Sequence, residues 1–208
     1  MEMPLSPAYF TRIDETDDRL FYAEPRIVTH IDDNAIAAIQ AFFNQILPRN
    51  SAILDLMSSA FSHLPDGFPS QRIVGLGLNA TELQANPALD EYVVHNLNAN
   101  PILPFADAEF AAVVMAVSVQ YLTRPIEVFR EVHRILQPGG PFIVIFSNRM
   151  FPTKAVYIWR VTSDMQHAEL VQLYFHLAEG YERVTVLDRT PQVDGYTDAV
   201  YIVMGHKR

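Results

Sequence analysis

The length, composition and charge of the chain exclude several classes of protein. Its 208 residues, half of them hydrophobic, suffice for one large domain with a full core, and 19% charged residues argue against extensive disorder. The net charge of −9 argues against nucleic acid as the main partner, since binding to phosphates requires clustered Lys and Arg. The chain has no cysteine, which excludes disulfides and cysteine nucleophiles. Without a long apolar run or a secretion-signal pattern at the start, we expect a cytoplasmic protein with no membrane partner.

The first fifty residues are predicted to form an N-terminal segment that ends in a helix. Residues 1–32 are irregular and interrupted by prolines. Apolar residues then recur at helical spacing from Ile36 to Ile46, with Asp32 or Asp33 as the N-cap, and Pro48 ends the helix. We expect residues 51–208 to form an α/β core and the whole chain, 1–208, to be a single domain.

Alternating apolar runs and amphipathic segments predict the core. Five runs read as buried strands, and they are Ser51–Leu56, Arg72–Leu78, Tyr92–Val94, Ala111–Val119 and Pro141–Phe146. Helices are expected from Pro125 to Leu136 and from Ser163 to Ala178, and Asn79 with Glu82 resembles a helix start. Arg183–Leu187 and Ala199–Met204 are predicted to pair as an antiparallel hairpin. This order predicts an α/β, Rossmann-like doubly wound sheet of seven mostly parallel strands with a C-terminal antiparallel hairpin.

Four motifs in this order resemble those of the class I S-adenosylmethionine (SAM)-dependent methyltransferases, especially the "methyltransferase type 11" group. They are Ile53-Leu54-Asp55-Leu56 at the first strand, Ile73–Leu78 at the second, Leu103–Phe110 (LPFADAEF) before the fourth, and Leu136-Gln137-Pro138-Gly139-Gly140 after the amphipathic helix. The resemblance implies SAM as the cofactor and a small molecule as the methyl acceptor.

Three polar signatures of that family are altered. The loop after the first strand, usually Gly-x-Gly-x-Gly, is Met57–Ser62 (MSSAFS) and contains no glycine. The acid that usually holds the ribose is replaced by Gly77, and Asn96 stands where an acid commonly lies near the adenine amine. Met57 and Phe61 are large enough to fill the pocket, whereas Gly77 would leave room for a larger or phosphorylated group.

The resemblance nevertheless implies a set of cofactor-binding residues. Ser58 and Ser59, expected where the first strand turns into a helix, would hold the amino acid end through N–H groups and hydroxyls. Asn79 would bond the ribose, the Asn96 carbonyl would accept from the adenine amine, and Leu78 and Leu97 would enclose the ring. The full set is Tyr22, Arg26, Asp55, Met57, Ser58, Ser59, Gly77, Leu78, Asn79, Asn96, Leu97 and Ala116.

The N-terminal segment is expected to lie over the cofactor as a lid in this family. Arg26 would pair there with the ligand carboxylate, with Tyr22 packed on the ligand. The alternative for Arg26 is a surface ion pair with an acid in Asp14–Asp18.

Two residues are candidates for catalysis. Tyr121 follows the fourth strand and would orient an acceptor, or else pack in the core. His30 would act as a base with Asp32 or Asp33, unless those acids only cap the helix. Their spacing with His30 is weak for a metal, and we expect no metal site. After the fifth strand, Ser147-Asn148-Arg149 and Lys154 would suit an anionic or polar acceptor.

Three functions follow from these patterns. The first is a SAM-dependent methyltransferase acting on an unidentified small molecule. The second is a non-catalytic protein with the methyltransferase fold that serves as a binding or interaction module. The third is an α/β enzyme that uses another nucleotide. The sequence leaves the oligomeric state open.

Overall fold

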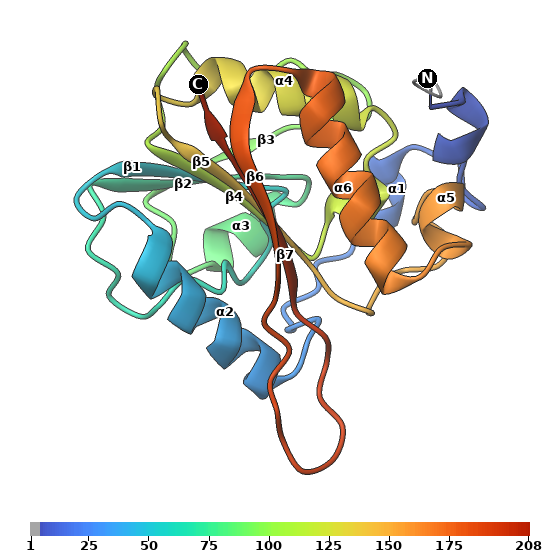
Figure 1. The fold of residues 1–208 in the computed structure, drawn as a ribbon, viewed down its shortest axis with the longest axis horizontal. Helices are drawn as coiled ribbons and strands as arrows, with labels where there is room; N and C mark the ends of the chain where they lie inside the picture. Colours follow the sequence, from blue (N-terminus) through green and yellow to red (C-terminus); the bar gives the residue numbers. More distant parts are fainter. Residues whose placement is uncertain (1–4) are drawn as a thin grey trace.

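The computed structural model describes residues 5–208 and contains one seven-stranded sheet in the order β3-β2-β1-β4-β5-β7-β6 (Figure 1). The first five strands run parallel, and β7 is antiparallel to both β5 and β6. The strands are β1 (Ala52–Leu56), β2 (Arg72–Gly77), β3 (Glu91–Val94), β4 (Ala112–Ala116), β5 (Pro141–Phe146), β6 (Tyr181–Asp188) and β7 (Tyr201–Lys207). The predicted doubly wound sheet with an antiparallel hairpin is therefore confirmed.

The longer predicted helices are also present. They are α2 (Asp33–Ile46), α4 (Pro125–Ile135) and α6 (Asp164–Ala178), and α3 (Ala80–Ala85) begins at the predicted Asn79 cap. Four shorter elements were not predicted: η1 (Pro7–Phe10), α1 (Asp18–Phe21), η2 (Val119–Tyr121) and α5 (Tyr157–Arg160). Each is only about one turn long, so none carries a helical apolar repeat that a sequence would show.

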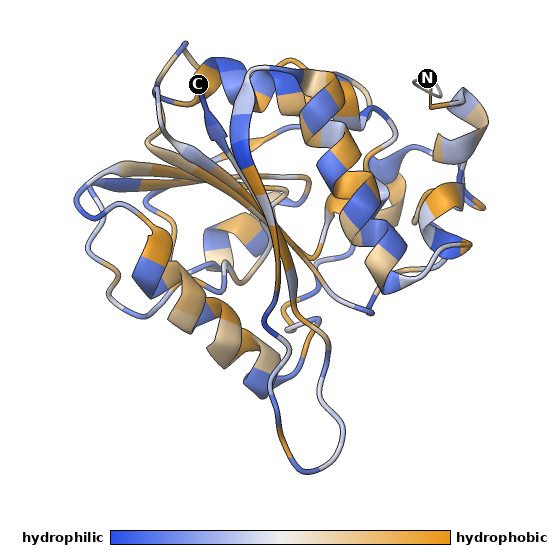
Figure 2. Ribbon diagram, viewed as in Figure 1, coloured by the Kyte–Doolittle hydropathy of each residue, from blue (hydrophilic) through white to orange (hydrophobic). Residues whose placement is uncertain are grey.

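Alternation along the strands divides the core into two layers. Ile53 of β1 faces the layer of α2, which contributes Ile39 and Phe43, while its neighbour Leu54 faces the opposite layer of α4 and α6. Successive strand residues point to opposite faces, so the strands buried on both faces are almost entirely apolar, with Asp55 of β1 as a buried exception. Figure 2 shows this arrangement, with apolar strands between helices whose outer faces are polar.

The connection from β1 to β2 contains no helix. Residues 57–71 form an irregular loop that Pro65 and Pro69 keep from helical geometry. Leu64 and Phe68 are buried from this loop and cover the α2 face of the sheet where a crossover helix is usual. The prediction that Ser58 and Ser59 begin a helix is therefore wrong.

The fourth strand is shorter than predicted. It ends at Ala116, because Val117 takes a left-handed conformation with φ 52° and the chain then turns into η2. A β-branched residue is strained in that conformation, so the apolar run Ala111–Val119 gave no sign of the turn. The shortened strand places Ala116–Ser118 at the carboxyl edge of the sheet.

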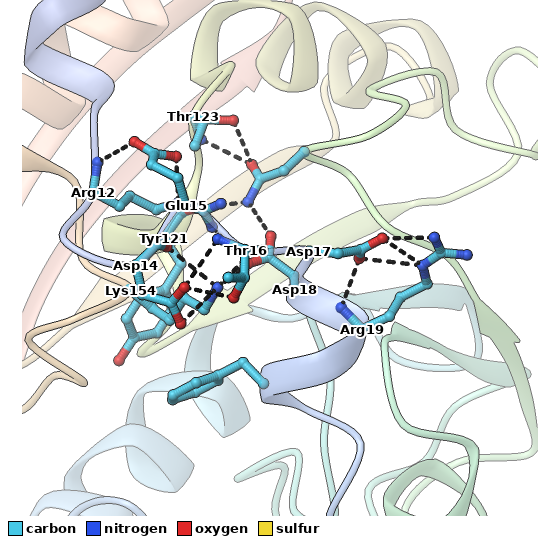
Figure 3. A network of polar contacts seen from close by, with 12 residues as sticks. Arg12, Asp14, Glu15, Thr16, Asp17, Asp18, Arg19, Tyr121, Thr123 and Lys154 are labelled. Atoms are coloured by element: carbon cyan, nitrogen blue, oxygen red, sulfur yellow. Dashed lines mark hydrogen bonds and ion pairs between the residues drawn. The ribbon is translucent and has the colours of Figure 1, made fainter.

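The N-terminal segment is attached to the core by a buried charged network (Figure 3). The ammonium group of Lys154, fully buried after β5, lies 3.2 Å from both Asp14 and Asp18, and Asp18 also pairs with Arg12 at 2.6 Å. Asp18 further accepts a hydrogen bond from Asn98 at 2.9 Å. These contacts fix α1 beside the carboxyl edge of the sheet.

Within residues 5–208, none of the helices is both long enough and apolar enough to cross a bilayer.

Candidate active site

A cavity of about 250 Å³ lies at the carboxyl ends of β1, β2 and β4, under the N-terminal segment. In open parallel sheets this edge is where ligands bind. All residues assigned to the cofactor or to catalysis line this cavity, and they are Tyr22, Arg26, His30, Asp55, Met57, Ser58, Ser59, Gly77, Leu78, Asn79, Asn96, Leu97, Ala116 and Tyr121. Of the residues assigned to the acceptor, Arg149 lines it, whereas Ser147, Asn148 and Lys154 do not. The structure thus places the cofactor and catalytic candidates around one cavity. The role of each residue stays a prediction, except where its hydrogen bonds contradict that role.

The large side chains of the altered loop do not fill the cavity. Met57 lies along its wall, and Phe61 is 40% exposed at the surface. Met57 has φ 60°, the left-handed conformation that glycine adopts without strain. The backbone here therefore follows a path suited to glycine although the residue is methionine.

The two serines of the loop use their hydroxyls within the protein. Ser58 donates to Asp55 at 2.5 Å, and Ser59 donates to Glu82 at 2.7 Å. The Ser58 N–H donates to the Leu76 carbonyl, and Asn86 donates to the Ser59 carbonyl at 2.8 Å. The prediction that Ser58 holds the ligand through its N–H and hydroxyl is therefore wrong, and the Ser59 hydroxyl is also occupied. These side-chain hydrogen bonds fix the conformation of the loop, which contains none of the glycines usual at this place in the family.

Asp55 is buried at the end of β1 beneath this loop. Burial raises the pKa of its carboxyl to about 6, and hydrogen bonds from Ser58 and Ser62 oppose that rise. Because the folded pKa lies above the unfolded value of 3.8, the native state binds the proton more tightly. Stability therefore falls as the pH rises from about 4 to about 6.

The Asp55→Asn variant tests this dependence. We expect the wild type to gain up to about 3 kcal/mol in unfolding free energy relative to the variant when the pH falls from 7 to 4, because the variant has no proton to bind. Urea denaturation of both proteins across this range measures the difference. A constant difference between the two proteins would show that Asp55 keeps an ordinary pKa.

Gly77 leaves no room for a larger group, contrary to expectation. A Cβ atom at this position would lie 2.2 Å from the backbone carbonyl oxygen of Ser58. The Ser58 N–H donates to the Leu76 carbonyl at 2.8 Å, and this bond keeps the Ser58 backbone close to β2. The space that an acid would take is therefore filled by the loop itself.

Two asparagines were predicted to form hydrogen bonds with the cofactor, but the atoms concerned already have partners within the protein. Asn79 caps α3 through its carbonyl oxygen, and its amide donates to the Tyr22 and Ala23 carbonyls at 2.9 and 3.1 Å. The Asn96 carbonyl oxygen accepts from the N–H groups of Asn98 and Ala99. Asn79 is thus fully used, and Asn96 offers its amide as a donor in place of the predicted acceptor.

Arg26 lies in an aromatic enclosure at the cavity wall. Its guanidinium carbon is 4.7 Å from the centre of the Phe21 ring and 5.4 Å from that of Phe151. Nη2 donates to the Phe21 carbonyl at 3.0 Å, while Nη1 is buried and has no hydrogen-bond partner within residues 5–208. The alternative of a surface ion pair is wrong, because Arg12 and Lys154 pair with the nearby acids instead.

The two catalytic candidates face the same cavity. The His30 ring makes an edge contact with Phe151, and burial lowers its pKa. Asp32 is the N-cap of α2, as the alternative interpretation of this residue predicted. The proposed His30–Asp32 pair is therefore not formed. The Tyr121 hydroxyl accepts from the Phe151 N–H at 2.8 Å, which leaves its own proton free to donate.

Sequence reasoning missed several residues of the cavity. Phe151, which was not among the candidates, contacts Arg26, His30 and Tyr121. His63 and Ser118 also line the cavity, and burial lowers the pKa of His63 to about 4. A motif search would have found neither, since each stands alone in an irregular segment. Lys154, assigned to the acceptor side, instead faces the N-terminal acids, and the Gln120 amide bonds to the Val117 carbonyl at 3.0 Å.

The part of the chain that the structure describes contains no group of three or more His, Asp or Glu side chains placed to hold a metal ion.

Comparisons with known proteins agree with this architecture. Residues 54–144 match the family described as "Methyltransferase domain". A ubiquinone/menaquinone biosynthesis C-methyltransferase of Nitrobacter hamburgensis is 30% identical over 112 residues, which cover 47% of this chain and 44% of that protein. The chain thus matches less than half the length of the curated relatives, and only 20% of a Mycobacterium tuberculosis protein.

Solved structures extend the likeness to most of the chain. The [4+2]-cyclase SpnF has a TM-score of 0.62 at 14% identity, over 91% of both chains. A SAM-dependent methyltransferase of Mesorhizobium loti has a TM-score of 0.55 at 15% identity, over 82% of this chain and 98% of that one. At these identities the likeness shows the fold alone. The chain therefore has the fold of the class I SAM-dependent methyltransferases and resembles that family over the residues of its motifs.

Proposed function

We propose that the protein is a SAM-dependent methyltransferase that acts on a small molecule. The observation that carries this proposal is a cavity at the carboxyl edge of the sheet whose wall includes the half-buried Arg26, with its buried Nη1 lacking a hydrogen-bond partner within residues 5–208. Leaving such an atom without a partner is costly, so a ligand carboxylate in the cavity would stabilise both groups. SAM carries a carboxylate at one end and an adenine ring at the other.

The residues present fit such a ligand in a modified way. Without a crossover helix, no helix N-terminus follows β1 to face the amino acid end, and Arg26 takes that role. Leu78 and Leu97 offer apolar surfaces for the adenine ring, and the free Asn96 amide donates to a ring nitrogen. We propose that residues 5–32 act as a lid, because they supply Tyr22, Arg26 and His30 to the wall.

The chemistry asks little of the protein beyond orientation. SAM, when bound, supplies a methyl group whose bond to sulfur breaks with the electron pair staying on sulfur, while a nucleophilic acceptor atom forms the new bond. Tyr121 and Ser118 would orient that acceptor, and the buried Ser118 hydroxyl has no hydrogen-bond partner within the described part of the chain. His30, held neutral by burial, would accept a proton from an acceptor hydroxyl or amine.

Calorimetric titration with SAM and S-adenosylhomocysteine tests the proposal. We expect both to bind, and we expect Arg26→Gln to weaken S-adenosylhomocysteine binding about tenfold, since it removes a charge-assisted hydrogen bond. 5′-Methylthioadenosine, which lacks the carboxylate, is the matched control and should bind both proteins equally. The absence of both binding heat and a thermal shift with SAM and with S-adenosylhomocysteine would refute the proposal.

A non-catalytic binding role is the second candidate. It is favoured by the filled acid position at Gly77 and by the fully bonded Asn79, which leave few polar groups for a ribose. Mass spectrometry of any ligand that stays bound through purification separates SAM, another nucleotide and an empty site. Transfer of a labelled methyl group by the purified protein would rule this second role out.

A further inference from the structure

A second, more open cavity of about 410 Å³ adjoins the candidate active site. It lies between the start of α2 and the loop that leads into β7, and its lining includes Thr29, His30, Asp32, Arg149, Tyr196 and Asp198. His30 and Arg149 also line the first cavity, so the two spaces meet at these residues. A molecule bound in the second cavity can therefore extend past His30 into the first.

We infer that this second cavity binds the anionic aromatic part of the acceptor, with its carboxylate or phenolate on Arg149 and its ring against Tyr196. That the bound molecule is a methyl acceptor rests on the proposed function. The binding site itself rests on Arg149, Tyr196 and the residues around them.

Arg149 is the positive charge that this cavity offers. Its side chain is 58% exposed, and within residues 5–208 its only ion pair is a long one, 3.8 Å from Nε to Asp198. A guanidinium with its terminal nitrogens open to a cavity is suited to a bidentate bond with a planar carboxylate. His30 adds no charge, because burial lowers its pKa.

The two carboxylates of the cavity accept hydrogen bonds from neutral donors, and Asp198 is in addition the distant partner of Arg149. Asp32 and Asp198 form a reciprocal pair in which each side chain accepts from the other's backbone N–H, at 2.9 and 2.6 Å. Asp32 also accepts from the Ala35 N–H and the Thr197 hydroxyl. Since Asp198 is buried and Asp32 caps a helix, these acids hold the β7 loop to α2 and are not free to bind a cation.

Tyr196 is an exposed aromatic side chain held in place at its polar end. It is 69% exposed, yet its hydroxyl donates to Asp198 at 2.7 Å and accepts from the Asn148 amide at 3.2 Å. An aromatic ring fixed in this way presents an apolar face at little further cost in conformational entropy. Its position beside Arg149 combines a ring surface with a cation, which matches an aromatic acid.

Ligand-observed NMR titrations on the full chain test the inference with three probes. Benzoate should bind more tightly than neutral benzamide, and cationic benzylamine should bind most weakly. Arg149→Gln should weaken benzoate binding about tenfold, Arg149→Lys less, and Tyr196→Leu should weaken benzoate and benzamide alike. Arg183→Gln is the matched control, because Arg183 is similarly exposed on β6 and does not line the cavity.

The site is separated from the first cavity by repeating the benzoate titration with S-adenosylhomocysteine at saturation and with the Arg26→Gln variant. Both should leave benzoate affinity unchanged. The inference is overturned if benzylamine binds as well as benzoate, if Arg149→Gln has no effect, or if S-adenosylhomocysteine displaces benzoate. Benzoate binding in a protein that binds no S-adenosylhomocysteine would refute the proposed function and leave this site standing.

Discussion

We expect Gly77→Asp, which restores the acid usual in the methyltransferase family, to destabilise the protein and to weaken cofactor binding. The new Cβ would meet the Ser58 carbonyl oxygen at 2.2 Å. This oxygen belongs to the backbone of a residue whose own N–H donates to the Leu76 carbonyl of β2, so it cannot move away easily. Overpacking of this kind costs about 1–3 kcal/mol, and the carboxylate would add repulsion against the carbonyl oxygen. Urea denaturation and titration with S-adenosylhomocysteine measure the two effects.

Two further variants isolate the cause at position 77. Gly77→Ala adds only the Cβ atom, so it should lose most of the same stability. Gly67→Asp adds an acid where nothing lies within 4 Å, and it should cost at most about 1–2 kcal/mol for its left-handed backbone. A Gly77→Ala protein as stable as the wild type would contradict the close contact with Ser58.

The second large effect is expected at Lys154. Lys154→Met leaves Asp14 and Asp18 without the buried ammonium group that lies 3.2 Å from each. Removing one partner of a buried ion pair typically costs about 3–5 kcal/mol. Arg12 still pairs with Asp18 in the variant, which places this substitution toward the lower end of that range. We expect a loss in that range, together with faster amide hydrogen exchange in residues 12–22.

Arg19→Met is the matched control for Lys154→Met. Arg19 pairs with Asp17 at 2.6 Å in the same segment, but its side chain is 75% exposed. Exposed pairs contribute little, so this variant should lose less than about 1 kcal/mol. Equal losses in the two variants would show that burial of Lys154 does not govern attachment of the segment.

Much of the fold was predictable because strands that are buried on both faces appear in the sequence as continuous apolar runs. Ser51–Leu56 and Pro141–Phe146 were located within one residue, since strands buried on both faces admit few polar side chains. The loop after β1 was not predictable, because its conformation depends on partners such as Glu82 and Asn86 that are distant in sequence.

The site was predictable in position but not in its hydrogen bonds. The carboxyl edge of the sheet follows from topology, which explains why Ala116 and Tyr121 were placed at the cavity. Asn79 and Ser58 were given to a ligand because a polar side chain shows no sign, in sequence, of a partner in its own fold. Tyr196 and Asp198 were overlooked because the turn between two hairpin strands reads only as polar.

Positions 57 and 77 constrain the path of the loop after β1 in different ways. The left-handed backbone of Met57 is already the one that glycine prefers, so methionine and glycine can replace each other there without moving the chain. At position 77, aspartate or glutamate can replace glycine only if the Ser58 carbonyl moves away from β2. An acid at position 77 therefore requires the loop to follow a different path, whereas an exchange of glycine and methionine at position 57 leaves that path unchanged.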